Sequence, residues 1–150
     1  MCDNAAEDDG AAPPPVGESR TIDIWWRGEN RNAALMLALA CLLRKRERAW
    51  RHVPLRLNMI VSRRTEEEAE ETVAAFLESA RVRAATRILK LEDGRPFAAL
   101  IAESSSESLC SFLGLRPPHA DEPDSEYGEY CRSLAESASD MSRVVLVLAG

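Results

Sequence analysis

Apolar residues alternate along residues 21–26 and again along Leu55–Val61, and this alternation predicts two β-strands. Between them, residues 33–43 are filled with Ala, Leu and Met and contain no Gly, Pro or β-branched residue, which predicts a helix. A strand, a helix and a strand in this order form a βαβ unit, which implies a parallel pair with a right-handed crossover. The helix is apolar nearly all round, so we expect its first three turns to be deeply buried.

The rest of the chain continues this alternation of helices and strands. A capping box at Thr65–Glu68 and a proline at Pro96 mark the starts of two helices. The last apolar run is continuous, as expected for a strand covered on both faces. The predicted elements after the βαβ unit are a helix to about residue 80, an edge strand over 84–91, a helix from 96, a strand over 109–113, a helix from about 124 and a strand over 144–148.

These elements predict the fold class. Strands that alternate with helices are typical of an α/β protein with three α/β/α layers around an open parallel five-stranded sheet. We expect the strand order 3-2-1-4-5, with the switch point between the first and fourth strands. Residues 1–18 are rich in Ala, Asp, Glu and Pro and predict a disordered acidic tail. Residues 19–150 then form one domain.

One motif in the first strand is specific enough to suggest a family. The motif is Thr21-Ile22-Asp23-Ile24-Trp25-Trp26, and further matches lie at Leu35-Met36-Leu37, Leu42-Leu43-Arg44, Trp50, Leu55-Arg56-Leu57, Phe112-Leu113-Gly114-Leu115-Arg116-Pro117-Pro118 and 144–148. With these, the chain from about Glu18 to Gly150 resembles the cytosolic C-terminal regulatory domain of the cation-chloride cotransporters, in a prokaryotic version. The resemblance implies an α/β fold related to universal stress proteins, a homodimer, and no membrane part in this chain.

Charge is distributed unevenly along the sequence. The net charge is −6, which argues against a nucleic-acid binder, but residues 21–64 carry ten basic and three acidic side chains. The densest basic run follows the first predicted helix. A purely structural interpretation is a solvated helix end, where basic side chains interact favourably with the negative pole of the helix dipole. The alternative is contact with an anionic membrane surface or a partner such as a membrane transporter domain, made by Arg44, Lys45, Arg46, Arg48 and Arg51.

Tandem Trp25 and Trp26 must point to opposite faces of their strand, and we interpret them as core anchors. Only 5% of the chain is aromatic, so a base-stacking surface is disfavoured. A run of serines, Ser104–Ser106 with Ser108, follows the third predicted helix. We interpret it as a frayed helix end in preference to a phosphorylation site.

Residues that commonly carry catalysis or bind cofactors show no recognisable spacing. The cysteines are scattered, and Cys41 and Cys110 lie in apolar runs, which favours buried thiols in a reducing cytoplasm. No metal-site or nucleophile-elbow spacing involves His52 or His119. We therefore expect no catalytic residue, no metal and no cofactor.

A small-anion site is the one ligand site that the predicted fold suggests. Ligands of such sheets bind beyond the carboxyl ends of the strands at the switch point, where Arg27, Asn30, Arg116 and His119 would meet. Phosphate-cradling glycine motifs are missing from the sequence, and prolines follow Gly114.

The residues alone indicate a non-enzymatic α/β domain in a reducing cytoplasm. The resemblance to the cotransporter domain implies a role in regulation and assembly, and a place at the inner face of the membrane if the basic run contacts lipid. The alternative is a stand-alone nucleotide-binding protein of the universal-stress type.

Overall fold

A computed structural model describes residues 20–26, 30–61 and 65–149. The predicted tail over residues 1–18 lies outside this part of the chain. The elements are β1 (Ile22–Trp26), α1 (Asn30–Arg46), a short 3-10 helix η1 (Arg48–Trp50), β2 (Leu55–Val61), α2 (Glu66–Ala80), β3 (Ala85–Lys90), α3 (Phe97–Ser104), β4 (Cys110–Gly114), α4 (Asp124–Ser137) and β5 (Val144–Val147).

The sheet confirms the predicted topology. Its five strands lie in the order β3-β2-β1-β4-β5, and all four neighbouring pairs are parallel. The central strand β1 is flanked on both sides, with Ile24 opposite Leu57 of β2 and Phe112 of β4. Each of its five residues is buried, because strands lie on both edges and helices on both faces.

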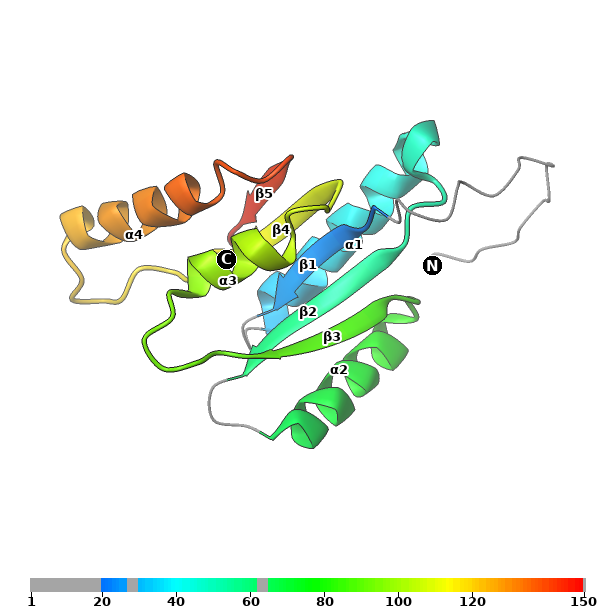
Figure 1. Ribbon diagram of the computed structural model, residues 1–150, viewed down its shortest axis with the longest axis horizontal. Helices are drawn as coiled ribbons and strands as arrows, with labels where there is room; N and C mark the ends of the chain where they lie inside the picture. Colours follow the sequence, from blue (N-terminus) through cyan, green and yellow to red (C-terminus); the bar gives the residue numbers. More distant parts are fainter. Residues whose placement is uncertain (1–19, 27–29, 62–64, 150) are drawn as a thin grey trace.

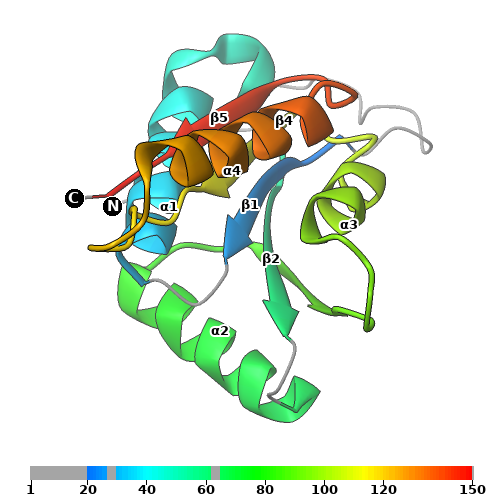
Figure 2. The ribbon, with the colours of Figure 1, turned by 90° about the vertical axis from the view of Figure 1, so that its left-hand side faces the viewer.

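Helices cover the two faces of the sheet and separate two cores. Figure 1 shows α3 and α4 in front of the sheet and α1 behind it, and the turned view in Figure 2 places α1 and α3 on opposite sides. The larger core joins Ile22, Ile24 and Trp26 of β1 to α1 and α2. The smaller core joins Trp25 to α3 and α4. The two tryptophans therefore anchor opposite faces, as predicted.

Local sequence signals define several helix ends. Thr65 and Glu68 form the predicted capping box, in which each side chain bonds the other residue's backbone N–H. At the other end of α2, Arg81 caps the helix in the left-handed conformation, with φ of 53°. Pro96 is the residue before the first turn of α3, where its missing N–H removes no helical hydrogen bond.

The expectation that α1 is deeply buried all round is wrong. Met36, Leu37 and Ala40 are buried against the sheet, but Leu35 is 38% exposed and Leu42 is 58% exposed. The reason is that α1 packs on only one face of the sheet, and no described element covers its outer side. High helix propensity and an apolar sequence thus produced a helix with a partly exposed apolar surface.

The expectation that the last strand is covered on both faces is also wrong. Val147 is buried, but Leu146 is 40% exposed and Leu148, just beyond the strand, is 45% exposed. β5 is one of the two edge strands of the sheet, with a neighbouring strand on one side only. The helices that cover the sheet centre do not extend fully over this edge.

Two leucines of α1 test this description of the helix. Leu37→Ala should lower the free energy of unfolding by about 2–5 kcal/mol, because it empties a buried site. Leu42→Ala, with the same chemistry on the same helix, should change it by less than about 0.5 kcal/mol. Urea unfolding followed by circular dichroism measures both, and equal losses in the two variants would contradict the one-sided packing of α1.

Candidate functional site

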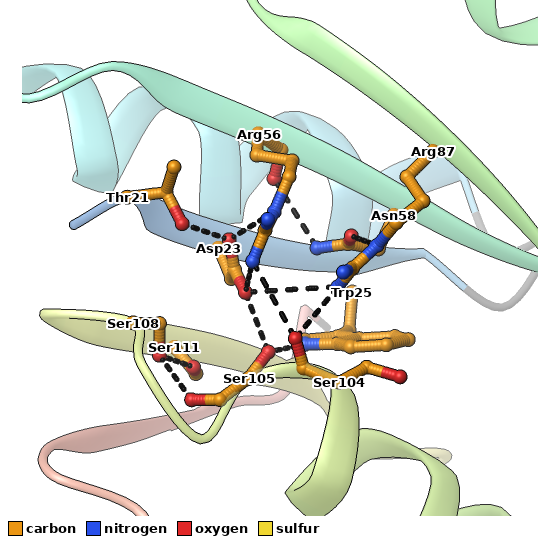
Figure 3. A network of polar contacts seen from close by, with 10 residues as sticks. All are labelled: Thr21, Asp23, Trp25, Arg56, Asn58, Arg87, Ser104, Ser105, Ser108 and Ser111. Atoms are coloured by element: carbon orange, nitrogen blue, oxygen red, sulfur yellow. Dashed lines mark hydrogen bonds and ion pairs between the residues drawn. The ribbon is translucent and has the colours of Figure 1, made fainter. Parts of the chain in front are cut away.

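A buried carboxylate is the centre of the main polar site. Asp23 lies on β1 with an exposed fraction of zero, on the sheet face that α3 covers (Figure 3). Its Oδ1 accepts hydrogen bonds from Thr21 Oγ1 at 2.7 Å and Arg56 Nε at 2.8 Å. Its Oδ2 accepts from Arg56 Nη2 at 2.7 Å and Ser105 Oγ at 2.5 Å. Four donors thus compensate the cost of removing this charge from water.

The parallel register brings the ion pair together. Asp23 and Arg56 are direct partners in the pairing of β1 with β2, so their side chains leave the sheet on the same face. Ser105 follows the C-terminal end of α3, so its hydroxyl reaches the carboxylate from the side of the sheet that α3 covers (Figure 3). The ion pair between Asp23 and Arg56 therefore joins two strands, and the hydrogen bond from Ser105 attaches the end of α3 to the same carboxylate.

A second guanidinium, that of Arg87, lies beside the first. It donates through Nε to Asn58 Oδ1 at 2.8 Å and through Nη2 to the carbonyl oxygen of Ser104 at 2.9 Å. Its Nη2 is 4.0 Å from Asp23 Oδ2, and its guanidinium lies 5.8 Å from the ring centroid of Trp25. β3 is thereby joined to the same cluster.

The charges of this cluster do not balance. Two guanidiniums, from Arg56 and Arg87, face the single carboxylate of Asp23. Burial lowers the pKa of Arg87 from its ordinary value, and the charge of Arg56 lowers it further, while Asp23 acts in the opposite direction. The cluster therefore holds one excess positive charge.

The serine run after α3 belongs to this network, so the interpretation as a frayed helix end is wrong. Ser105 and Ser108 are buried, as is Ser111 of β4. Ser108 Oγ donates to the carbonyl oxygen of Ser105 at 2.9 Å and lies 2.8 Å from Ser111 Oγ. The Trp25 indole N–H donates to Ser105 Oγ at 2.9 Å. These hydroxyls satisfy polar groups between α3 and the sheet.

A cavity of about 460 Å³ opens beside the cluster. It lies toward the amino ends of β1 and β2, next to the end of α3, and is the opposite end of the sheet from the switch point. Its lining is mainly polar and consists of Thr21, Arg56, Arg87, Arg95, Leu100, Glu103, Ser104, Ser106 and Glu107.

The predicted anion site at the switch point is only partly described. Arg27 and the side chain of Asn30 lie outside the described part of the chain. Arg116 and His119 do line one cavity there, of about 280 Å³, together with Trp26 and neighbouring residues. Among the described residues, the buried indole N–H of Trp26 has no hydrogen-bond partner.

Arg116 is already engaged by the protein itself. Its Nη1 and Nη2 bind the Glu122 carboxylate at 2.8 and 2.5 Å, and its guanidinium lies 4.4 Å from the Tyr130 ring centroid. The hydrogen bond from Arg116 is the main cause that lowers the pKa of Glu122 to about 2. Beside it, the Asn32 amide bonds the carbonyl oxygen of Leu115 and the N–H of Ala149, at 2.7 Å each, so its donor and acceptor are both used.

The basic run lies at the end of α1 and around η1. Arg44 is half-buried, and its Nη1 donates to the carbonyl oxygen of Val53 at 3.4 Å. The other four predicted contact residues, Lys45, Arg46, Arg48 and Arg51, are exposed. Contact with an anionic surface stays a prediction.

Other site types receive no support within the described residues. These residues contain no cluster of three or more metal-binding side chains, and His52 and His119 are both exposed. No helix among them is both long and apolar enough to cross a membrane. Cys41 and Cys110 are buried thiols, as predicted, and burial raises the pKa of Cys110.

Comparisons with known proteins do not identify a family. A scan against protein-family models found no matching family, and a search of curated proteins found no match. The structure itself defines the class as a three-layer α/β/α protein with a 3-2-1-4-5 parallel sheet.

Removal of the buried carboxylate should strongly destabilise the fold. Asp23→Ala leaves Arg56 without its partner, and we expect a loss of about 3 kcal/mol, at the low end for a buried pair because the Arg56 side chain is 25% exposed. Glu103→Ala is a matched control, because it breaks the exposed pair with Arg95 and should cost less than about 1 kcal/mol. Urea unfolding measures the free energy of unfolding of both variants. Similar losses would show that the buried Asp23 carboxylate stabilises the fold no more than an exposed ion pair does.

Glu122 should give the fold a pH dependence in acid. Its pKa is lower in the folded protein than its ordinary value of 4.5, so its stabilising effect is full above pH 4.5 and is lost as pH falls toward about 2. A carboxyl ¹³C NMR titration should show a midpoint near pH 2. Arg116→Gln should return that midpoint toward 4.5, and an unchanged midpoint would rule out the pair as its cause.

Proposed function

We propose that this chain is a non-catalytic regulatory and assembly domain of the kind that the cation-chloride cotransporters carry at their cytosolic C-terminus. The α/β fold agrees with what the sequence resemblance implies for that domain. The polar groups of the Asp23 cluster are largely bonded to one another, which suits a scaffold better than a reactive centre. Such a domain acts on ion transport through a membrane partner to which it is joined or docked.

The exposed edge of the sheet is the observation that carries the assembly proposal. β5 and β3 each have a neighbouring strand on one side only, and at β5 the exposed Leu146, with Leu148 just beyond the strand, adds apolar surface. An open strand edge presents unpaired backbone groups that can pair with another strand. We therefore assign the β5 edge as the interface of a homodimer.

The geometry favours assembly over nucleotide binding at the switch point. Arg116, the arginine that lines the described cavity there, is held by Glu122, and the Asn32 amide is used to join the ends of β4 and β5. Pro117 and Pro118 supply no backbone N–H to a phosphate at this edge. A nucleotide would have to compete with contacts that hold the fold together.

Charged substitutions at the edge test the dimer. Wild type should sediment at twice its 16.6 kDa mass at high micromolar concentration. Leu146→Lys with Leu148→Lys should weaken self-association at least about tenfold, because lysine at a strand edge opposes strand pairing. Sedimentation velocity over a concentration series measures this.

Leu42→Lys is the matched control for that experiment. It places the same charge at an exposed leucine on α1, in a groove that faces α2, and should leave the association constant within about twofold. Monomeric wild type at every concentration, or equal weakening by the Leu42 variant, would refute β5 as the interface.

A further inference from the structure

The cavity beside Asp23 contains cationic donors that the fold does not use. Arg56 is held through Nε and Nη2, and Arg87 is likewise held through Nε and Nη2. No hydrogen bond within the described residues involves Nη1 of either arginine. Both side chains line the cavity and are 25% and 29% exposed. Each guanidinium is therefore fixed in place with N–H groups left for a ligand.

The charge of the cluster defines the ligand's sign. Arg56 and Arg87 share the carboxylate of Asp23, so these three side chains present a local positive charge to the cavity. Glu103 and Glu107 supply the other carboxylates of its lining. The mutual repulsion of the two guanidiniums contributes to the lowered pKa of Arg87. An anion placed between them would relieve this repulsion, and fixed guanidinium groups suit the tetrahedral oxygens of a phosphoryl group.

The remaining lining defines what the ligand carries besides its charge. Glu103 and Glu107 supply carboxylate oxygens, and Ser106 supplies an exposed hydroxyl. The Glu103 carboxylate also pairs with Arg95 at the rim. Glu103, Ser106 and Glu107 all accept hydrogen bonds from hydroxyls, and the two carboxylates would repel a phosphate placed against them. The volume of about 460 Å³ leaves room for more than a phosphate ion.

We propose that this cavity binds a small phosphate monoester that carries hydroxyl groups, with its phosphoryl group at Arg56 and Arg87 and its hydroxyls toward Glu103 and Glu107. The site lies at the amino ends of the strands, at the opposite end of the sheet from the switch point. It is also separate from the β5 edge, so it goes beyond the proposed assembly function and can be tested independently of it.

Titrations at constant ionic strength with three probes test the proposal on the wild-type chain. Glycerol 3-phosphate should bind several-fold more tightly than inorganic phosphate, and glycerol alone should give no saturable change in ¹H–¹⁵N NMR spectra. The amide shifts should centre on Arg87, Ser104 and Ser106. Shifts centred on Leu115–His119 instead, or no saturable shifts with either phosphate, would overturn the assignment.

Matched variants separate this site from general attraction of anions. Arg87→Gln should weaken binding of both phosphates at least about tenfold, because the ligand then loses one charge-assisted hydrogen bond from the guanidinium. Arg46→Gln removes the same charge from the exposed end of α1 and should change affinity less than about twofold. Equal weakening by the two variants would overturn the proposal.

A further variant keeps the test decisive if Arg87→Gln fails to fold. Glu107→Gln removes an exposed negative charge from the rim without breaking a hydrogen bond within the described residues, so the fold should tolerate it. It should tighten inorganic phosphate about two- to fivefold, because it removes a repulsion near the guanidiniums. Unchanged phosphate affinity in this variant would place the anion outside the cavity.

Discussion

The structure depends on the ion pair between Asp23, which is fully buried on the central strand, and Arg56 of the next strand. Removing such a charge from water costs several kcal/mol unless donors replace the lost hydration. Arg56 supplies two hydrogen bonds from the adjacent strand, and Thr21 and Ser105 supply the others. The ion pair fixes the register of β1 against β2, because a shift of one residue would move the arginine to the opposite face.

The hydrogen bonds to Asp23 also shape the cavity at the amino ends of β1 and β2. Satisfying Asp23 positions the C-terminal end of α3, and α3 in turn places Ser104 where its carbonyl oxygen accepts from Arg87. Two guanidiniums are then gathered around one carboxylate, and both line the cavity beside it. At the other end of the sheet, the Asn32 amide and the Arg116–Glu122 pair bind protein atoms to each other. The two ends therefore differ in what they leave available to a ligand.

Much of the fold followed from short-range patterns, but burial did not. Alternation, caps and prolines placed all five strands and four helices within a few residues, because these signals act locally. The exposure of Leu42 and Leu146 could not be read from an apolar sequence, since it depends on which elements lie beside α1 and β5. The buried serines were missed for the same reason. A charged residue within apolar strands, Asp23 or Arg56, was the signal that could have indicated the polar cluster.

The sequence by itself determined the order of strands and helices, the parallel α/β class and the opposite placement of Trp25 and Trp26, because each is encoded in periodicity over neighbouring residues. Only the tertiary structure decided that Asp23, Arg56 and Arg87 meet, because they lie on three strands that are brought together by helical crossovers. It also decided that Arg116 binds Glu122, a contact that depends on the path of one loop. Charge and hydrogen bonding act through space, so residues far apart in the chain become a site only when the sheet has formed.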